Sequence, residues 1–259
     1  MSESLYIAAS GMNAQQSNID TIANNLANVN TTSFKKSKVE FEDLLYREVM
    51  KSNGLVGETQ NSQSIGLGAG ISNTSKIFSM GEMKKTDRPL DIAIQGDGFY
   101  EVVLPDGSYG YTRAGSFHVN SDGYLVNNDG YMVSPLVQVP SDTQQVLVSP
   151  DGTVKVQVTG NQDLLETGRI ELAKFVNPSG LNPAGDNLYL PTEQSGDALY
   201  SVPGEDGTGV VAQGFLEASN VSLVEELTNM ILAQRAYEIN SKVVQASDEM
   251  MSIVNNLRR

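Results

Sequence analysis

The 259-residue chain contains no cysteine and a single histidine, His118. Without cysteine it can form no disulfide, no thiolate metal site and no Cys–His nucleophile, and one histidine cannot make a histidine metal cluster. The lack of cysteine fits a protein that works outside the cytoplasm without covalent cross-links. We therefore expect neither a thiol-based enzyme nor a His/Cys metal centre.

Long apolar runs are also missing. The first ten residues, MSESLYIAAS, have neither the basic start nor the apolar stretch of a secretory signal, and no later segment is long enough to span a bilayer. We expect that, if the protein leaves the cell, it is exported by another route without a cleaved signal peptide.

Basic residues are scarce, with 17 Lys and Arg against 31 Asp and Glu and a net charge of −14. This charge repels nucleic acid and anionic lipid, so no nucleic-acid partner is expected. Residues 1–38 hold two acids and three bases, and residues 220–259 hold five acids and four bases, so the acidic excess lies between them. Near-neutral ends can pack against copies of themselves, while an acidic middle keeps the surface soluble.

Apolar residues at both ends follow helical spacing. The N-terminal set forms one a/d seam: Leu5, Ala8, Met12, Gln15, Ile19, Ile22, Leu26 and Val29. A second helix is predicted after Ser222, which forms a capping-box pattern with Glu225, and Glu238 and Lys242 are spaced as an i,i+4 ion pair. Its two apolar stripes are Leu223, Leu227, Met230, Gln234 and Tyr237, and Leu232, Ala236, Ile239, Val243, Ala246, Met250, Ile253 and Leu257.

The helices can pair within one chain, which buries one seam on each of them. The second helix carries more apolar surface than one partner covers, and this favours packing between subunits.

The middle of the chain has strand-like periodicity and four Asp-Gly pairs, at 106–107, 122–123, 129–130 and 151–152, that predict tight turns. Strands are predicted at residues 91–94, 99–104, 109–113, 116–119, 124–127, 145–149, 153–158 and 169–176. Residues 51–75 lack a clear period and are expected to be extended or ordered only by neighbours.

The predicted fold class is α+β, with a central, mainly antiparallel β domain. Three regions are expected: N- and C-terminal helices forming a coiled-coil domain (1–34 plus 220–259), an extended or loop connector (35–85) and a β-rich outer domain (86–219).

No pattern singles out catalytic, metal-binding or cofactor-binding residues. Asn120–Gly123 resembles part of a calcium loop, but His118 and Asp129 stand where the motif needs Asp and Glu, so a hairpin turn is predicted. The glycine-rich segment 66–70 lacks the Lys and Ser/Thr of a P-loop, and no G-x-S-x-G elbow accompanies His118. A periplasmic β-domain enzyme using two carboxylates and a monomeric secreted binding module remain alternatives.

Five stretches resemble the bacterial flagellar rod and hook axial proteins. They are ANNLANVNTTSFKK (23–36), DIAIQGDGFYEV (91–102), YTRAGSF (111–117), GYLV (123–126) and SNVSLVEELTNMILAQRAYEINSKVV (219–244). Chain length, a single β domain and the segment FEDLLYREV favour the distal rod type over the longer hook type, with the proximal rod type as the nearest alternative. Ser33 stands where the family has glycine, so we predict no left-handed backbone there.

The resemblance implies a structural subunit, without cofactor or enzymatic activity, that self-assembles into a helical tube and transmits torque. Terminal helices would line the inner wall as a coiled coil, with the β domain outside. Export would use the flagellar type III apparatus, and the protein would lie in the basal body rod that spans the periplasm. The implied partners are copies of itself, proximal rod proteins, the hook protein, P-ring and L-ring proteins and the export apparatus. The segment 46–71 is associated in this family with a rod that stays straight.

Helix packing between subunits is predicted for the apolar residues Leu5, Met12, Ile19, Ile22, Leu26, Val29, Leu227, Met230, Ile231, Tyr237, Val243, Met250, Ile253 and Leu257. Polar residues expected to fix the register between subunits are Asn24, Asn25, Asn28, Gln234 and Arg235. The asparagines have a second interpretation, in which they weaken the helix end and let the chain turn at residues 30–33.

Overall fold

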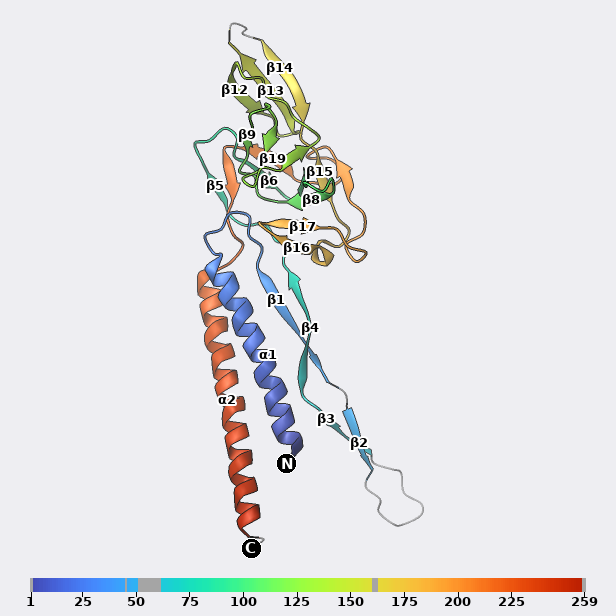
Figure 1. Ribbon diagram of the computed structural model, residues 1–259, viewed down its shortest axis with the longest axis vertical. Coiled ribbons are helices and arrows are strands. Elements are labelled where there is room, and N and C mark those ends of the chain that lie inside the picture. Colours follow the sequence, from blue (N-terminus) through green and yellow to red (C-terminus); the bar gives the residue numbers. More distant parts are fainter. Residues whose placement is uncertain (1, 45, 51–61, 160–162, 258–259) are drawn as a thin grey trace. The chain divides into compact units, whose positions relative to one another are not determined.

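The computed structural model describes residues 2–44, 46–50, 62–159 and 163–257 (Figure 1). Within them, helix α1 (Ser2–Ala27) opens the chain, strands follow, and helix α2 (Leu223–Asn256) closes it. The chain divides into two units. The helical unit contains α1, α2 and strands β1–β4, and the β unit contains residues 28–36 and 77–221. The predicted α+β class with antiparallel sheets is confirmed.

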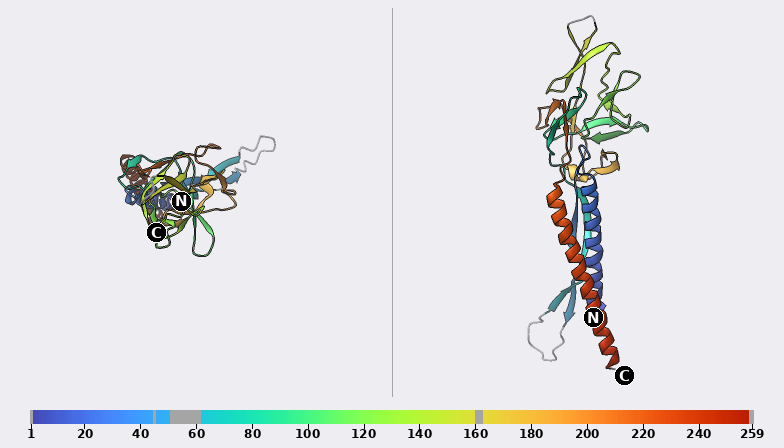
Figure 2. Two further views of the ribbon diagram at one scale, coloured as in Figure 1. Left: turned by 90° about the horizontal axis from the view of Figure 1, so that it is seen from above. Right: turned by 90° about the vertical axis from the view of Figure 1, so that its left-hand side faces the viewer.

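In the helical unit, α1 and α2 lie side by side and run in opposite directions (Figures 1 and 2). At 1.5 Å per residue, the 26 residues of α1 span about 39 Å and the 34 residues of α2 about 51 Å. The C-terminal turns of α2 therefore continue past the start of α1. Ser222 is the N-cap of α2 as predicted, but its side chain forms no capping hydrogen bond.

The first helix ends earlier than its heptad pattern predicted. Asn28 and Val29 lie beyond Ala27, in a turn where the Thr31 N–H donates to the Asn28 carbonyl at 3.1 Å. The Thr31 hydroxyl also donates to Asn28 Oδ1 at 3.1 Å. The asparagine side chain thus stabilises a turn in place of another helical residue, which is why this residue type disfavours helix interiors.

Two antiparallel ribbons complete the helical unit. Strand β1 (Ser37–Asp43) pairs with β4 (Ala69–Lys76), and β2 (Tyr46–Met50) pairs with β3 (Ser62–Gly66). The segment expected to be extended thus contains paired strands, whereas the part of that prediction covering 51–61 lies outside the described residues.

Among its described residues, the β unit contains one seven-stranded antiparallel sheet, one three-stranded sheet and three strand pairs. The large sheet has the order β16 (Asn182–Gly185), β17 (Leu188–Leu190), β8 (Tyr109–Thr112), β7 (Tyr100–Val103), β11 (Met132–Ser134), β10 (Leu125–Val126) and β9 (His118–Val119). The three-stranded sheet contains β12 (Thr143–Val148), β13 (Thr153–Val158) and β14 (Leu164–Arg169). The pairs are β15 (Leu172–Lys174) with β18 (Leu199–Ser201), β19 (Val210–Gln213) with β6 (Ile92–Gln95), and β20 (Phe215–Glu217) with β5 (Met83–Lys85). One short 3₁₀ helix, η1, spans Pro178–Gly180.

The four Asp-Gly turns form as predicted. Gly107, Gly123, Gly130 and Gly152 all have φ between +80° and +88°, a conformation that glycine adopts at no steric cost. One strand prediction needs correction: residues 169–176 are divided, because Arg169 ends β14 and only Leu172–Lys174 form β15. Between them the Ile170 N–H donates to the carbonyl of Gly152, which separates the two strands.

The core of the β unit is formed by large apolar side chains. One buried cluster includes Ile92, Ile94, Val102 and Leu172, and the rings of Tyr100 and Phe117 pack edge to face at 5.0 Å. A second cluster is largely aromatic, built around Phe99, Tyr111, Phe175 and Tyr189. Burial of this much apolar surface is the main term that stabilises the β unit.

Candidate functional site

The face of α2 that meets α1 is made of small and polar side chains. Glu226, Ala233, Asn240 and Ser247 repeat at seven-residue spacing, and three of the four are buried. Asn240 lies against Gly11 of α1, where a Cβ on Gly11 would come within 2.9 Å of Asn240 Nδ2. The two helices therefore pack through a seam that neither predicted apolar stripe supplies.

Both apolar stripes of α2 remain exposed in the single chain. Leu232 is 62% exposed, Ile239 61% and Ile253 59%. Of the predicted packing residues on this helix, Met230 is half-buried, while the following are exposed: Leu227, Ile231, Tyr237, Val243, Met250 and Leu257. Exposed apolar surface of this extent is typical of interaction sites on proteins.

The predicted seam of α1 is better covered. Ile22 is buried, and the remaining predicted positions, Leu5, Met12, Ile19, Leu26 and Val29, are half-buried. Ala8 and Ala14 are also buried, because α1 packs against β1 and β4 as well as against α2. Half-buried side chains retain surface that a further partner can cover.

Asn25 links three elements of the helical unit. Its amide nitrogen donates to the Ser37 carbonyl at 2.9 Å and to the Glu226 carboxylate at 3.2 Å, and its oxygen accepts from the Ser37 N–H at 2.8 Å. The side chain is 2% exposed, and both amide hydrogens have partners within the chain. Within one chain Asn25 therefore fixes α1 against β1 and α2, and its role in the register between subunits stays a prediction.

The other four polar residues predicted to fix the register between subunits lie in different surroundings. Asn24, Gln234 and Arg235 are exposed, and Asn28 is half-buried in the turn after α1. The Glu238 carboxylate pairs at 3.0 Å with Arg235, one turn earlier, in place of the predicted pair with Lys242.

A buried charged cluster lies in the β unit. Lys35 Nζ contacts one oxygen of Glu217 at 2.6 Å, and Arg113 Nε contacts the other at 2.9 Å. All three side chains are at most 2% exposed. Buried charges are tolerated only where partners satisfy them, so this cluster requires accurate geometry.

Backbone groups complete the cluster. Lys35 also donates to the Ser79 carbonyl at 2.7 Å, and Glu217 accepts from the Gly81 N–H at 2.8 Å. The guanidinium of Arg113 donates to the carbonyls of Gly98 and Gly96 at 3.0 and 2.8 Å.

These contacts shift the titration of the charged groups. Burial, with the nearby Arg113 cation, lowers the pKa of Lys35. Burial alone raises the pKa of Glu217, but Arg113, Lys35 and the hydrogen bonds from Lys35 and Gly81 together hold that pKa below its ordinary value. The carboxylate is therefore kept ionised between two cations.

Ser33 corrects another expectation. Its φ is +60°, in the left-handed region, and it is 1% exposed. Its hydroxyl donates to the Arg113 carbonyl at 2.9 Å and its N–H to the Glu217 carbonyl at 2.8 Å. The left-handed backbone is thus retained although glycine is absent, because hydrogen bonds to both ends of the cluster offset the steric cost of the side chain.

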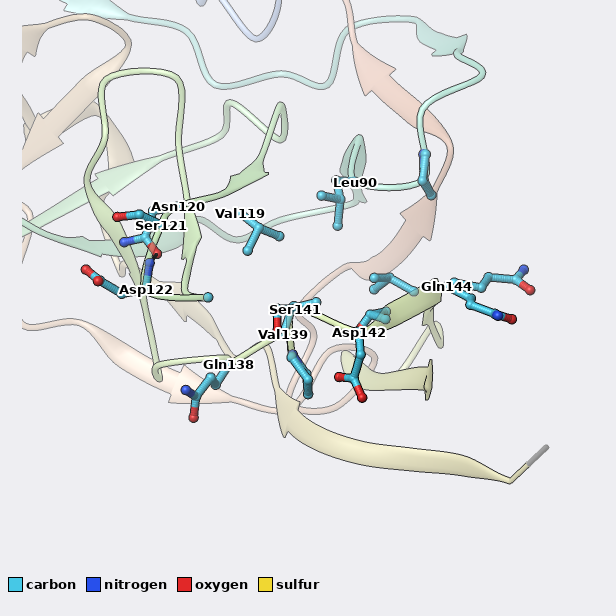
Figure 3. A pocket seen from close by; sticks show the side chains of 16 residues that line it. Leu90, Val119, Asn120, Ser121, Asp122, Gln138, Val139, Ser141, Asp142 and Gln144 are labelled. Carbon is cyan, nitrogen blue, oxygen red and sulfur yellow. Dashed lines mark hydrogen bonds between the residues drawn. The ribbon is translucent and has the colours of Figure 1, made fainter. Parts of the chain in front are cut away.

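A pocket of about 700 Å³, lined by both polar and apolar side chains, lies elsewhere in the β unit (Figure 3). Asn120, Ser121 and Asp122 line one side, and Gln138, Ser141 and Asp142 belong to another segment. Amide, hydroxyl and carboxylate groups of this kind can bind neutral or cationic groups, whereas the two carboxylates disfavour anions. Asn120 also accepts the N–H groups of Asp122 and Tyr124, so the expected hairpin turn is present.

No group of three or more His, Cys, Asp or Glu side chains is arranged for a metal ion within the described residues. In the same part of the chain, neither helix is long and apolar enough to cross a membrane. His118 lies in β9 opposite Val126, as expected for a cross-strand residue.

Sequence reasoning missed the charged cluster, because Lys35, Arg113 and Glu217 are far apart in the chain. The available signal was that Lys35 and Arg113 both belong to stretches with family resemblance and that Glu217 lies two residues before a third.

Terminal helices that expose large apolar side chains, together with a β unit that has its own buried core, are the features of a structural subunit. Three family models match the chain: "Flagella basal body rod protein" at residues 5–35, "Flagellar hook protein FlgE/F/G D1 domain" at 93–156 and "Flagellar basal body rod FlgEFG protein C-terminal" at 212–257.

Full-length relatives narrow the class. Proteins named flagellar basal-body rod protein FlgG are 47% identical in Borreliella burgdorferi, 43% in Caulobacter vibrioides and 40% in Bacillus subtilis, and each alignment covers at least 99% of both chains. The chain belongs to the flagellar basal-body rod protein family, of the distal rod type. It is a structural subunit of the flagellar basal body and not an enzyme, as predicted.

Proposed function

We propose that copies of this chain assemble into a helical tube through their terminal helices, which line the inner wall as a coiled coil. The exposure of both α2 stripes carries this proposal. Helices that expose large apolar residues are completed by neighbouring helices in oligomers, because burial of that surface drives association. A tube of this kind transmits torque by its stiffness.

The partners follow from a place in the rod. We infer contacts with copies of this chain along the tube, with proximal rod proteins at one end and the hook protein at the other, and with the P-ring and L-ring proteins around it. Export through the flagellar type III apparatus, without a cleaved signal peptide, is part of the same proposal. The acidic β unit suits the outer surface of the tube, since repulsion between like charges prevents non-specific association.

The test places a charge in one α2 stripe. Ile239→Asp is expected to leave the free energy of unfolding of the dilute chain within about 0.5 kcal/mol of its original value, because the side chain is exposed. In a flagellated strain lacking the native chain, this variant should yield no complete rods in electron micrographs of isolated basal bodies. A charge buried between apolar helices is too costly to retain.

Gln245→Asp is the matched control, since it adds the same charge at an exposed position of α2 outside both stripes. It should support rods and motility. Complete rods formed by Ile239→Asp would contradict the proposal.

A further inference from the structure

The pocket of the β unit combines exposed polar side chains with covered apolar ones (Figure 3). Leu90, Val119 and Val139 are buried or half-buried, and Leu90 packs against the buried core of the unit. Gln138 and Asp142 are exposed at the rim. A volume of about 700 Å³ is within the range of sites that hold small ligands.

One wall of the pocket is a hairpin turn joined to the segment that follows β11. The Asn120 oxygen accepts from the N–H groups of Asp122 at 3.0 Å and Tyr124 at 2.8 Å, which fixes the turn. The Val139 N–H donates to the Gly123 carbonyl at 2.7 Å. The two segments that carry most of the polar side chains are therefore held together by their backbones.

The opposite side of the pocket is fixed in the same way. Gln213 donates through Nε2 to the Pro89 carbonyl at 2.7 Å and to the Val146 carbonyl at 2.9 Å. The Asp142 carbonyl accepts from both the N–H and the hydroxyl of Thr159, each at 3.0 Å. Because these bonds hold the walls before any ligand arrives, binding requires little ordering of the chain.

The side chains at the rim have bonding capacity to spare. In the part of the chain that the structure describes, the Asn120 amide nitrogen, the Gln138 amide and the Asp142 carboxylate have no hydrogen-bond partner in the protein. Their positions are set by backbone contacts, whereas their polar groups meet solvent. A ligand can therefore exchange water for these groups without breaking a bond of the fold.

We propose that this pocket binds a neutral oligosaccharide of about two or three sugar rings. Amides donate and accept hydrogen bonds, as sugar hydroxyls do, and a carboxylate accepts strong bonds from hydroxyls. The apolar side chains Leu90, Val119 and Val139 can cover the C–H faces of the rings, which favours transfer of those faces out of water.

The arrangement of charge favours a neutral ligand over a compact cation. Asp122 and Asp142 are the only charged side chains among the residues that line the pocket. In Figure 3 they lie apart, with Val139 and Ser141 drawn between them. A compact cation needs several oxygens that converge on one point, whereas an extended saccharide meets separated groups along its length.

Binding can be measured on the full chain in dilute solution. Nuclear magnetic resonance spectra of nitrogen-15-labelled protein would be recorded with triacetylchitotriose or maltotriose at up to about 5 mM, which suffices to detect a millimolar site. Saturable shifts of backbone amides are expected at residues 119–123 and 138–146. The two sugars differ in their acetamido groups, so their relative affinities show whether the rim prefers acetamido sugars or plain polyols.

Two substitutions at the rim test the assigned groups. Gln138→Ala should weaken saccharide binding about three- to tenfold, since it removes one amide. Gln194→Ala is the matched control, because it removes an exposed amide of the β unit outside the pocket and only backbone atoms of Gln194 form hydrogen bonds. It should leave the affinity unchanged. Near-UV circular dichroism of the buried tyrosines verifies that each variant is folded.

Spermidine serves as the cationic probe in the same titrations. Asp142→Asn keeps an acceptor at the rim, so it should weaken saccharide binding no more than about tenfold. The proposal is overturned if neither sugar gives saturable shifts, if Gln138→Ala binds as well as the original chain, or if Gln194→Ala loses as much affinity. It is also overturned if spermidine binds more tightly than both sugars and loses that affinity in Asp142→Asn. None of these readings depends on assembly of the tube.

Discussion

The β unit and the helical unit bury opposite kinds of side chain. The β unit encloses Ile92, Tyr100 and Phe117, none of which has measurable exposure. In the helical unit, α2 turns Glu226, Ala233 and Ser247 inward, while large residues such as Ile239 and Ile253 remain exposed. The β unit thus buries its large apolar side chains within the single chain, whereas α2 leaves many of its own exposed.

This difference separates folding from assembly. A small-residue seam lets α1 and α2 approach closely without consuming their most apolar surface, which stays available for other helices. Changes in the two regions should therefore affect different observables.

The largest effect is expected where the β unit buries charge. Glu217→Gln should lower the free energy of unfolding by about 3–5 kcal/mol at neutral pH, because removal of one partner leaves buried charges uncompensated. The pKa of Glu217 is held below its ordinary value of 4.5. Its contribution to stability is therefore complete above about pH 4.5 and is lost as the pH falls through the folded-state pKa.

Urea unfolding followed by tyrosine near-UV circular dichroism, from about pH 3 to pH 6, tests this prediction. The original chain should lose stability below pH 4.5 more steeply than Glu217→Gln does. Equal slopes in the two proteins would show that the cluster does not hold the carboxylate ionised.

A second prediction uses one substitution in both regions. Ile92→Ala should lower the free energy of unfolding of the β unit by about 2–5 kcal/mol, since it removes buried methyl groups and leaves a cavity. Ile239→Ala should change the stability of the dilute chain by no more than about 0.5 kcal/mol, because this side chain is 61% exposed. Urea titration of both variants at neutral pH gives the comparison. A similar loss in the two variants would mean that Ile239 is already covered in the dilute chain.

Some of this contrast could be predicted from the sequence. Periodicity indicated both terminal helices and their surplus of apolar surface, and Asp-Gly pairs indicated the turns, because local chemistry determines these features. Which face of α2 meets α1 could not be predicted this way. Hydrophobicity selects the largest side chains, whereas close approach of the helices at Gly11 and Asn240 depends on small ones.

The charged cluster of Lys35, Arg113 and Glu217 could not be predicted from the sequence for a different reason. Lys35 and Glu217 are separated by more than 180 residues, and each taken alone is typical of a solvated surface. Only the fold brings them together. The contacts that Asn25 makes within the chain were likewise not predicted, because the sequence cannot show that Ser37 and Glu226 lie beside its amide.

A smaller effect than at Glu217 or Ile92 is expected at Ser33, where the left-handed backbone and the hydroxyl act in opposite directions. Ser33→Ala keeps the strain of a side chain at φ +60° and removes the hydrogen bond to the Arg113 carbonyl, so it should destabilise by about 1–2 kcal/mol. Ser33→Gly loses the same hydrogen bond but relieves the strain, so its stability should lie within about 0.5 kcal/mol of the original chain. Thermal unfolding of both variants separates the contribution of the backbone strain from that of the hydroxyl hydrogen bond. If glycine destabilises as much as alanine does, the hydroxyl and not the backbone conformation determines stability at this position.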